Sequence, residues 1–130
     1  MVEFRSATIS DYDSIRDFLS ENGWNQRVAD PDRFRRMMEN ATRIVLAVEN
    51  GDVVGFARAL CDDASNGYIG TVAVSQRMRG RGIGRELVER LMGDDPNITW
   101  VLRAGRADSV GFWEKMGFRP SDVAMERERK

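Results

Sequence analysis

The sequence predicts an α+β protein in which a mostly antiparallel, twisted sheet carries helices on its faces. Three observations lead to this prediction. Strand-like and helix-like runs alternate along the whole chain. Two strand-like runs are joined by Asn50-Gly51, which is typical of a tight hairpin because both residues tolerate positive φ. A glycine-rich turn follows another strand-like run and opens a helical pattern, which indicates a short parallel step.

The first part of the chain is predicted to form one strand and two helices. Residues 2–7 form the strand, and the segment 8–11, Thr-Ile-Ser-Asp, resembles a capping box for a helix that ends near Gly23. A second helix begins at Asp30-Pro31, because aspartate caps a helix and proline fits its first position.

The rest of the chain is predicted to contain the remaining strands and two further helices. Apolar residues at helical spacing follow Ile83, and a last helix is expected from Asp108 to Met116. The strands are expected at residues 43–49, 52–61, 68–74 and 98–103, with one or two more in 117–129. The prediction is therefore one domain, residues 1–130, with six to seven strands and about four helices.

Composition excludes several kinds of catalytic site. The chain of 130 residues contains no histidine, which rules out Ser-His-Asp and Cys-His catalysis and histidine-ligated zinc. Its one cysteine, Cys61, cannot form an internal disulfide and has no histidine or second cysteine with which to share a metal. We therefore expect no metal, and we expect Cys61 to be a small buried apolar residue.

Charge and hydropathy limit the expected partners. The net charge of −1 gives no general affinity for nucleic acid, so any anion would bind at a local cluster of positive charge. The first ten residues lack an apolar signal region, and no apolar run is long enough to span a bilayer. The expected protein is cytoplasmic, with neither nucleic acid nor membrane as a partner.

A cluster of arginines and glycines between a predicted strand and helix carries the strongest functional signal. The segment 79–84 reads Arg-Gly-Arg-Gly-Ile-Gly, and the start of a helix can hold a phosphate through its free N–H groups and its dipole. A dinucleotide fingerprint would need glycine in place of Arg85, and the Gly-Lys-Ser/Thr of a P-loop is absent. The segment fits a third pattern, Arg/Gln-x-x-Gly-x-Gly. The alternative is a solvated turn that binds nothing.

With this pattern, the sequence resembles the GNAT superfamily of acyl-CoA-dependent N-acyltransferases. The resemblance covers nearly the whole chain and depends most on the glycine-rich motif together with an aromatic-x-x-x-Gly-Phe pattern downstream. Four segments carry it: FRSATISDYDSI, the Asn-Gly hairpin, IGTVAVSQRMRGRGIGRELV and ADSVGFWEKMGFRP. It implies that the strands 68–74 and 98–103 splay apart in a V and leave a slot for an acyl thioester.

The resemblance also implies which residues bind the cofactor, acetyl-CoA. Val72 and Val74 would pair through their backbone with the pantetheine amides, and the Val72 N–H would stabilise the oxyanion. The backbone of the glycine-rich turn would hold the pyrophosphate, and one or two of its arginine side chains would meet phosphates. The residues of this turn are Arg79, Gly80, Arg81, Gly82, Ile83, Gly84 and Arg85.

The last helix departs from the family pattern. Many members have Asn-x-x-Ala-x-x-aliphatic-Tyr there, in which the asparagine contacts the cofactor and the tyrosine protonates the leaving thiolate. Here Arg106 and Trp113 occupy the asparagine and tyrosine positions. Indole has no accessible acid proton, so Trp113 is expected to pack, against the pantetheine arm, while Arg106 either approaches a phosphate or faces solvent.

No general base is evident. Some relatives have a glutamate where this chain has Tyr68, and a phenol is a poor base at neutral pH unless it is strongly perturbed. Tyr68 is therefore one candidate, with packing on the sheet as the alternative. Asp62 and Asp63, in the loop before it, could reach an amine through water or could simply be solvated. Direct attack by an amine needs mainly proximity and an oxyanion donor, so water could transfer the protons.

These residues predict an N-acetyltransferase that moves an acetyl group from acetyl-CoA to a primary amine in a ternary complex. The segment 23–30 is expected to face this acceptor, with Trp24, Asn25 and Arg27 as contacts. One alternative is a non-catalytic acyl-CoA-binding module with the same fold, and another is a nucleic-acid binder that uses the arginine cluster. An exposed edge strand near the C-terminus is expected to permit a homodimer.

Overall fold

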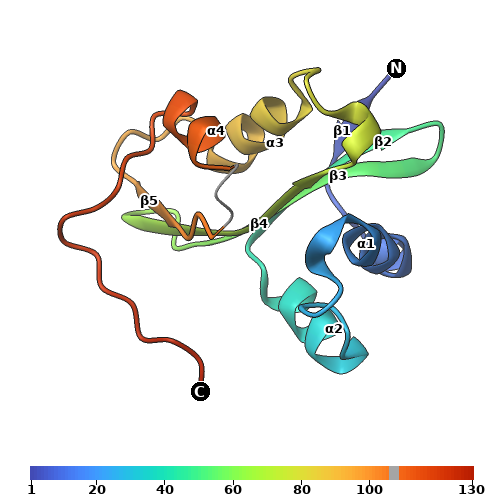
Figure 1. The fold of residues 1–130 in the computed structure, drawn as a ribbon, viewed down its shortest axis with the longest axis horizontal. Coiled ribbons are helices and arrows are strands. Elements are labelled where there is room, and N and C mark those ends of the chain that lie inside the picture. Colours follow the sequence, from blue (N-terminus) through green and yellow to red (C-terminus); the bar gives the residue numbers. More distant parts are fainter. Residues whose placement is uncertain (106–108) are drawn as a thin grey trace.

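The computed structural model describes residues 1–105 and 109–130, and in these ranges a five-stranded sheet lies between two layers of helices (Figure 1). The strands follow one another across the sheet in chain order. They are β1 (Glu3–Arg5), β2 (Arg43–Glu49), β3 (Asp52–Cys61), β4 (Asn66–Val74) and β5 (Thr99–Leu102). Neighbouring strands are antiparallel except β4 and β5, which are parallel. The predicted fold class, with a mostly antiparallel sheet and one parallel step, is confirmed.

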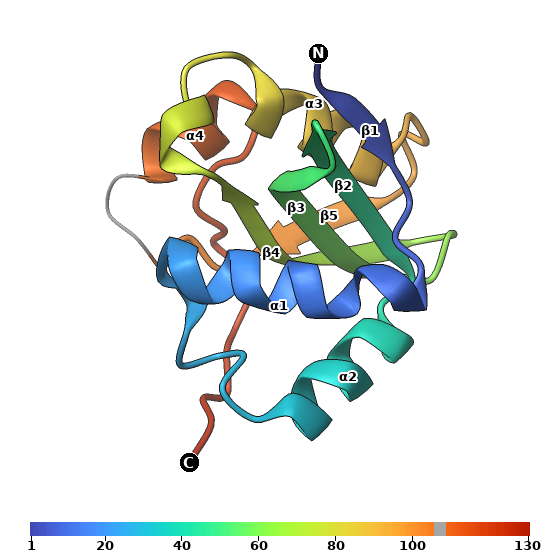
Figure 2. The ribbon, with the colours of Figure 1, turned by 90° about the vertical axis from the view of Figure 1, so that its right-hand side faces the viewer.

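Helices cover both faces of the sheet. The pair α1 (Tyr12–Leu19) and α2 (Pro31–Asn40) lies on one face, and α3 (Ile83–Met92) and α4 (Val110–Lys115) lie on the other (Figure 1 and Figure 2). Short 3-10 turns precede α1 and α3, and a π-type turn, Ser20–Trp24, follows α1. The four helices of the described residues agree with the number predicted.

The sheet has fewer strands than the six to seven expected from the sequence. Among the described residues no strand follows α4, and residues 117–130 run as an extended tail past the outer side of β5 (Figure 1). The last five residues are all charged and Pro120 lacks an N–H, so the segment lacks a full set of donors for a sheet ladder, and its apolar side chains Val123 and Met125 remain exposed. An ion pair of 2.8 Å between Arg103 and Glu126 attaches the tail near the end of β5.

Local sequence signals define where several elements begin. The Asp30 carboxylate accepts hydrogen bonds from the backbone N–H groups of Asp32 and Arg33, at 2.9 and 3.2 Å, and caps α2 as predicted. Asn50 and Gly51 have φ of 53° and 82° and form the predicted tight turn between β2 and β3. Both features depend on neighbouring residues alone, which is why the sequence was sufficient to predict them.

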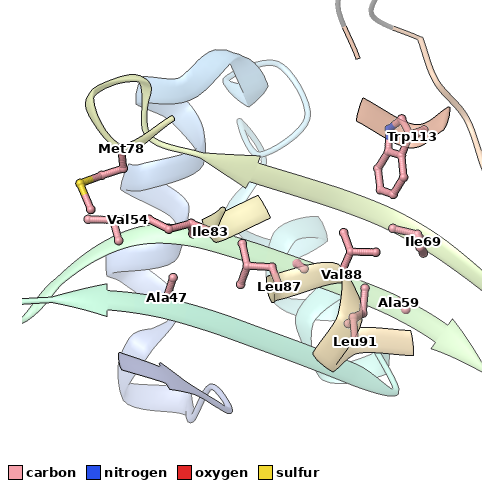
Figure 3. Packing of buried hydrophobic residues seen from close by; sticks show 11 residues of the cluster. Ala47, Val54, Ala59, Ile69, Met78, Ile83, Leu87, Val88, Leu91 and Trp113 are labelled. Carbon is pink, nitrogen blue, oxygen red and sulfur yellow. The ribbon is translucent and has the colours of Figure 1, made fainter. Parts of the chain in front are cut away.

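Two apolar cores join the helices to the sheet. The first lies between the sheet and α3, and the helix contributes a stripe of buried side chains (Figure 3). This stripe consists of Ile83, Leu87, Val88 and Leu91. The second core, on the other face, includes Phe18 of α1, Phe34 of α2, and Phe56 and Ala73 of the sheet. Burial of each large side chain contributes about 1.5–3 kcal/mol, so the two cores hold the strands that carry the site in fixed positions.

Candidate functional site

β4 leaves β5 partway along its length. The parallel pairing ends at Ile69 and Leu102, whereas β4 continues beside β3 to its last residue. Gly70 has no partner on β3, because the register shifts between Ile69 and Thr71, so Gly70 forms a β-bulge. Beyond the bulge, the stretch 70–74 has a neighbouring strand on one side only. This divergence agrees with the V-shaped splay that the resemblance implied.

The unpaired side of β4 presents backbone groups to the gap between the strands. Ser75, just after β4, donates its N–H to the Val54 carbonyl at 2.9 Å and therefore faces β3. Backbone groups alternate in direction along a strand, so those of Val72 and Val74 point away from β3. In agreement, Arg79 Nε lies 3.5 Å from the Val74 carbonyl oxygen. This orientation suits the predicted pairing of Val72 and Val74 with pantetheine amides.

The glycine-rich turn connects this strand edge to α3. Gly80 and Gly82 have φ of 81° and 80°, a left-handed conformation that other residues rarely adopt, and nothing lies within 4 Å of a Cβ built on either. Gly82 is the N-cap of α3, whose first N–H groups have no carbonyl partner within the helix. Free donors and the positive end of the helix dipole coincide here, which favours an anion.

Gly84 has a different role from the other two glycines. A Cβ at Gly84 would lie 3.2 Å from Phe112 Cε1 and 3.7 Å from Val74 Cγ2. The missing side chain therefore lets α3 approach both α4 and β4 closely. Glycine is required at position 84 by the close packing of three elements. At positions 80 and 82 it is favoured by the left-handed backbone.

A pocket of about 520 Å³ joins the glycine-rich turn, the unpaired edge of β4, and α4. The predicted site residues that line it are Trp24, Val72, Val74, Arg79, Gly80, Gly82, Ile83, Gly84, Arg85 and Trp113. It is also lined by residues that were not predicted to be in the site, namely Asn22, Ala73, Met78, Ser109, Phe112, Lys115 and Met116. The pocket thus combines a turn suited to phosphate with a strand edge suited to amides.

Four of the seven residues missed in the sequence belong to α4 or are adjacent to one of its ends. Ser109, Phe112 and Met116 follow the three- and four-residue spacing of one helical face, and Lys115 lies three residues after Phe112. That spacing could have indicated that these residues share one face of the helix. Phe112 was missed because an apolar side chain in a helix is usually a core residue. Its ring is only half-buried, so it both packs against Gly84 and lines the pocket.

Positive charge surrounds the pocket. Its charged lining residues are Arg79, Arg85 and Lys115, and no carboxylate among the described residues lines it. Arg85 also lies 3.4 Å from Glu89, one turn further along α3, in an exposed pair that restrains it only weakly. Three cations around a helix start suit a ligand with several phosphate groups.

Several predicted site residues lie outside the pocket lining. Arg81, Asn25 and Arg27 are exposed and do not border the pocket, and Arg106 lies outside the described residues. Tyr68 is half-buried in the part of β4 that is paired on both sides, before the bulge. The roles proposed for Asn25, Arg27, Tyr68 and Arg81 remain predictions without support from the pocket lining, and the role of Arg106 remains a prediction.

The acidic loop 62–65 uses its carboxylates for its own conformation. Asp62 accepts hydrogen bonds from the Ser65 hydroxyl and from three backbone N–H groups that follow it, and these donors hold the pKa of its carboxyl well below the ordinary value. Asp63 forms an ion pair of 2.7 Å with Arg43. Neither aspartate lines the pocket, and the contacts of both stabilise the loop.

Trp113 belongs to an aromatic cluster. Its ring meets Phe112 and Phe118 edge to face, with centroid distances of 4.9 and 5.3 Å, and only 9% of the residue is exposed. The indole therefore forms part of the pocket wall. This placement agrees with the packing role expected from its chemistry.

Two further findings concern metals and membranes. Within residues 1–105 and 109–130, no group of three or more His, Cys, Asp or Glu side chains could hold a metal ion. In the same ranges no helix is both long and apolar enough to cross a bilayer. Cys61 is buried, as expected.

Sequence comparison relates the chain to known acetyltransferases. The sequence model of the acetyltransferase (GNAT) family matches residues 9–118. Serotonin N-acetyltransferase 2, a chloroplastic protein of Oryza sativa subsp. japonica, is 28% identical over 120 residues, covering 88% of this chain and 59% of that protein. Peptidyl-lysine N-acetyltransferase YjaB of Escherichia coli is 29% identical over 107 residues, covering 82% of this chain and 67% of that protein. The chain thus spans roughly three fifths to two thirds of the length of these relatives.

Solved structures share the fold. A GNAT-family acetyltransferase from Streptococcus pneumoniae has a TM-score of 0.78 at 20% identity, covering 98% of this chain and 100% of that chain. An aminoglycoside N-acetyltransferase in complex with CoA has a TM-score of 0.76 at 14% identity, covering 100% of this chain and 95% of that chain. The matched family model includes the glycine-rich turn, the diverging strands and α4, and the chain therefore belongs to the acetyltransferase (GNAT) family.

Proposed function

We propose that the protein transfers an acetyl group from acetyl-CoA to a primary amine of a small molecule or peptide, by direct attack in a ternary complex. One observation carries the proposal: a single pocket joins the glycine-rich turn, with its free N–H groups and nearby cations, to the unpaired edge of β4. In this arrangement the pyrophosphate binds at the start of α3, and the pantetheine arm extends along β4. Membership of the family supports CoA as the carrier of the acyl group.

Each part of the pocket has a role in this proposal. The N–H groups of the turn and the side chains of Arg79, Arg85 and Lys115 bind the phosphates. The backbone of Val72 and Val74 pairs with the amides of the pantetheine arm. The Val72 N–H donates to the oxyanion that forms on the thioester carbonyl, an interaction of a kind that contributes about 3–4 kcal/mol in other acyl transfers. Support for this last role comes from the direction of the Val72 backbone groups, away from β3.

The reaction proceeds without an acid or a base from the pocket lining. The amine lone pair attacks the thioester carbonyl carbon and forms the C–N bond, and the tetrahedral intermediate then expels the CoA thiolate as the C–S bond breaks. Water takes the proton from the amine nitrogen and returns a proton to the thiolate. The protein contributes mainly proximity and the oxyanion donor. The acceptor must be an unprotonated amine, so the rate should rise with pH through the pKa of that amine.

Steady-state assays of free-thiol release test the proposal. The panel of acceptors should include a lysine-containing peptide and serotonin, because the names of two relatives specify such acceptors, and also amino acids and amino sugars. We expect thiol release above the rate of hydrolysis with at least one amine, and kinetics that require both substrates to be bound together. Binding of acetyl-CoA without turnover of any amine on the panel would reject the proposal.

A second candidate function is a non-catalytic acyl-CoA-binding module. The observation that favours it is that neither a carboxylate nor a tyrosine of the described residues lines the pocket. Both candidates predict CoA binding, so only turnover separates them. A protein that binds acetyl-CoA and releases no thiol with any amine on the panel would favour the module over the enzyme.

A further inference from the structure

Arg58 is a half-buried positive charge without an acidic partner. It lies on β3, and it forms no ion pair with any residue in the ranges 1–105 and 109–130. Its Nε donates a hydrogen bond to Thr71 Oγ1 at 3.2 Å, and Thr71 is itself buried. The terminal nitrogens, Nη1 and Nη2, have no acceptor among the described residues. Because arginine stays charged in proteins and charges withdrawn from water are ordinarily paired, this guanidinium is suited to bind an anion.

The backbone beside Arg58 is shaped to hold the guanidinium. A Cβ on Gly70 would lie 2.7 Å from Arg58 Cζ and 2.8 Å from both terminal nitrogens. The guanidinium therefore lies directly on the bulge of β4, where any larger residue would displace it. Thr71 is opposite Arg58 in the β3–β4 register and holds Nε from the side. Gly70 and Thr71 together fix both the position and the orientation of the charge.

The guanidinium lies between a covered part and an open part of one sheet face. At one end of this face, Phe56 and Ala73 are packed beneath α1 and α2. At the other end, Leu60 and Val101 are 42% and 41% exposed. Side chains alternate along a strand, so Arg58 shares the face of Phe56 and Leu60 and lies between them. A molecule approaching over the open part meets Arg58 at the edge of the helical layer.

The same position is close to the proposed acetyl-transfer site. Ala73 lines the pocket, and Thr71 precedes it by two residues on the same face of β4, about 7 Å away. Arg58 contacts Thr71, so its charge lies beside a residue that is two positions from the pocket wall on β4. Thr71 and Ala73 both belong to the stretch of β4 that has separated from β5.

We infer that Arg58 binds an anionic group on the amine acceptor, so that acceptors carry a carboxylate or a phosphate in addition to the amine. The inference rests on the proposed acetyltransferase function and specifies the substrate class for that site. The two terminal nitrogens form a planar pair of donors that matches two oxygens of a carboxylate or a phosphate.

Matched acceptors that differ only in the anion test the inference. An amino acid is compared with its amide, and an amino sugar phosphate with the free amino sugar, by kcat/KM for thiol release expressed per unprotonated amine, because the anion also changes the pKa of the amine. We expect the parent to prefer an anionic acceptor by about tenfold or more, which is the effect of one charge-assisted hydrogen bond or more. The pair that shows the preference identifies the anion as a carboxylate or a phosphate.

Variants assign the preference to the guanidinium. In Arg58→Gln, kcat/KM for the anionic acceptor divided by kcat/KM for the neutral acceptor should fall to about one, and acetyl-CoA affinity should be unchanged. Arg58→Lys should give an intermediate value of this ratio, because it keeps the charge and loses the planar pair of donors. Arg36→Gln is the matched control: the same change at an exposed arginine on α2 should leave the ratio as in the parent. Thermal melting checks that each variant is folded.

Different results would overturn the role of Arg58 and the proposed acetyltransferase function. Turnover without a preference for anionic acceptors, or the same preference in the parent and in Arg58→Gln, would overturn the inference and leave the acetyltransferase intact. Absence of any turnover would overturn the proposed function instead. In that case NMR of the arginine Nε–H groups decides the inference, with the same acids and amides titrated in the presence of CoA. A shift of the Arg58 signal with an acid and not with its amide supports the inference, and no shift overturns it.

Discussion

Two loops at opposite ends of β4 use their polar groups in opposite ways. In the loop 62–65, before β4, Asp62 accepts hydrogen bonds from its own loop and Asp63 pairs with Arg43. In the turn 79–84, after β4, the left-handed glycines and the start of α3 leave backbone N–H groups without partners in the helix, beside a pocket. A charged loop is therefore not a site when its charges are already satisfied. Unsatisfied donors beside a cavity are the better indication of ligand binding.

The largest expected effect is on CoA binding in the glycine-rich turn. In Gly82→Glu, a negative side chain would occupy the open space beside the turn and repel the pyrophosphate. Loss of two charge-assisted hydrogen bonds, at about 1.5–3 kcal/mol each, should weaken acetyl-CoA binding by roughly two to four orders of magnitude. Calorimetric titration measures this affinity, and thermal melting checks the fold.

Gly51→Glu is the matched control for Gly82→Glu. Gly51 has φ of 82° and nothing within 4 Å of a built Cβ, but it lies in the hairpin between β2 and β3 and does not line the pocket. Both variants should lose about 1–2 kcal/mol of stability, because the left-handed conformation is strained for a residue with a side chain. Only Gly82→Glu should lose affinity. A folded Gly82→Glu protein that binds acetyl-CoA as the parent does would falsify the phosphate assignment.

A smaller effect should distinguish two cations near the turn. Lys115 lines the pocket from α4, whereas Arg81 belongs to the turn itself but does not line the pocket. Lys115→Gln should weaken acetyl-CoA binding about tenfold, the value of one charge-assisted contact, and should make binding less dependent on salt. Arg81→Gln should change the affinity by less than about twofold, because exposed charges contribute little. Equal losses in calorimetric titrations of the two variants would contradict the prediction, because lining the pocket would then not distinguish a cation that binds the cofactor from one that does not.

The acidic loop should affect stability and not catalysis. Asp62→Ala removes the acceptor for three backbone N–H groups and one hydroxyl, so the melting temperature should fall. Its kcat/KM for the best amine should stay within about twofold of the parent, whereas loss of a general base lowers the rate by about 100-fold or more. A rate loss of that size in a folded protein would make Asp62 the base and would remove the distinction between the two loops.

The smallest expected effect is on stability in acid. Hydrogen bonds from Ser65 to Asp62 and from Arg5 to Asp11 hold the pKa values of both carboxyls below their ordinary range in the folded protein. In the unfolded chain these carboxylates bind protons at about pH 4. The stability that the two ionised carboxylates contribute is therefore complete above that pH and is lost progressively below it. Denaturant titrations from neutral pH downward should show this decline in the free energy of unfolding. The decline should be shallower in Asp62→Ala, and identical slopes would contradict the assignment.

Features that depend on neighbouring residues were predicted well from the sequence. The boundaries of β2 and β3 agree with the prediction, because the Asn50-Gly51 turn sets both strand ends. The start of α2 agrees because its cap and first residue are adjacent in the chain. The one or two strands expected in residues 117–129 are not formed, since a strand also needs a partner edge and a buried apolar face, and propensity supplies neither.

Local chemistry along the chain is thus sufficient to specify the order of the elements and the phosphate-type turn, because a few adjacent residues set each of them. Which side chains meet across the fold depends on distances between remote segments, and no local pattern contains these. The contact between Gly84 and Phe112 follows from how closely α3 and α4 approach, and the same approach brings Lys115 to the pocket. The bulge at Gly70 likewise separates β4 from β5 and places Arg58 beside Thr71 with no acid to pair with it among the described residues.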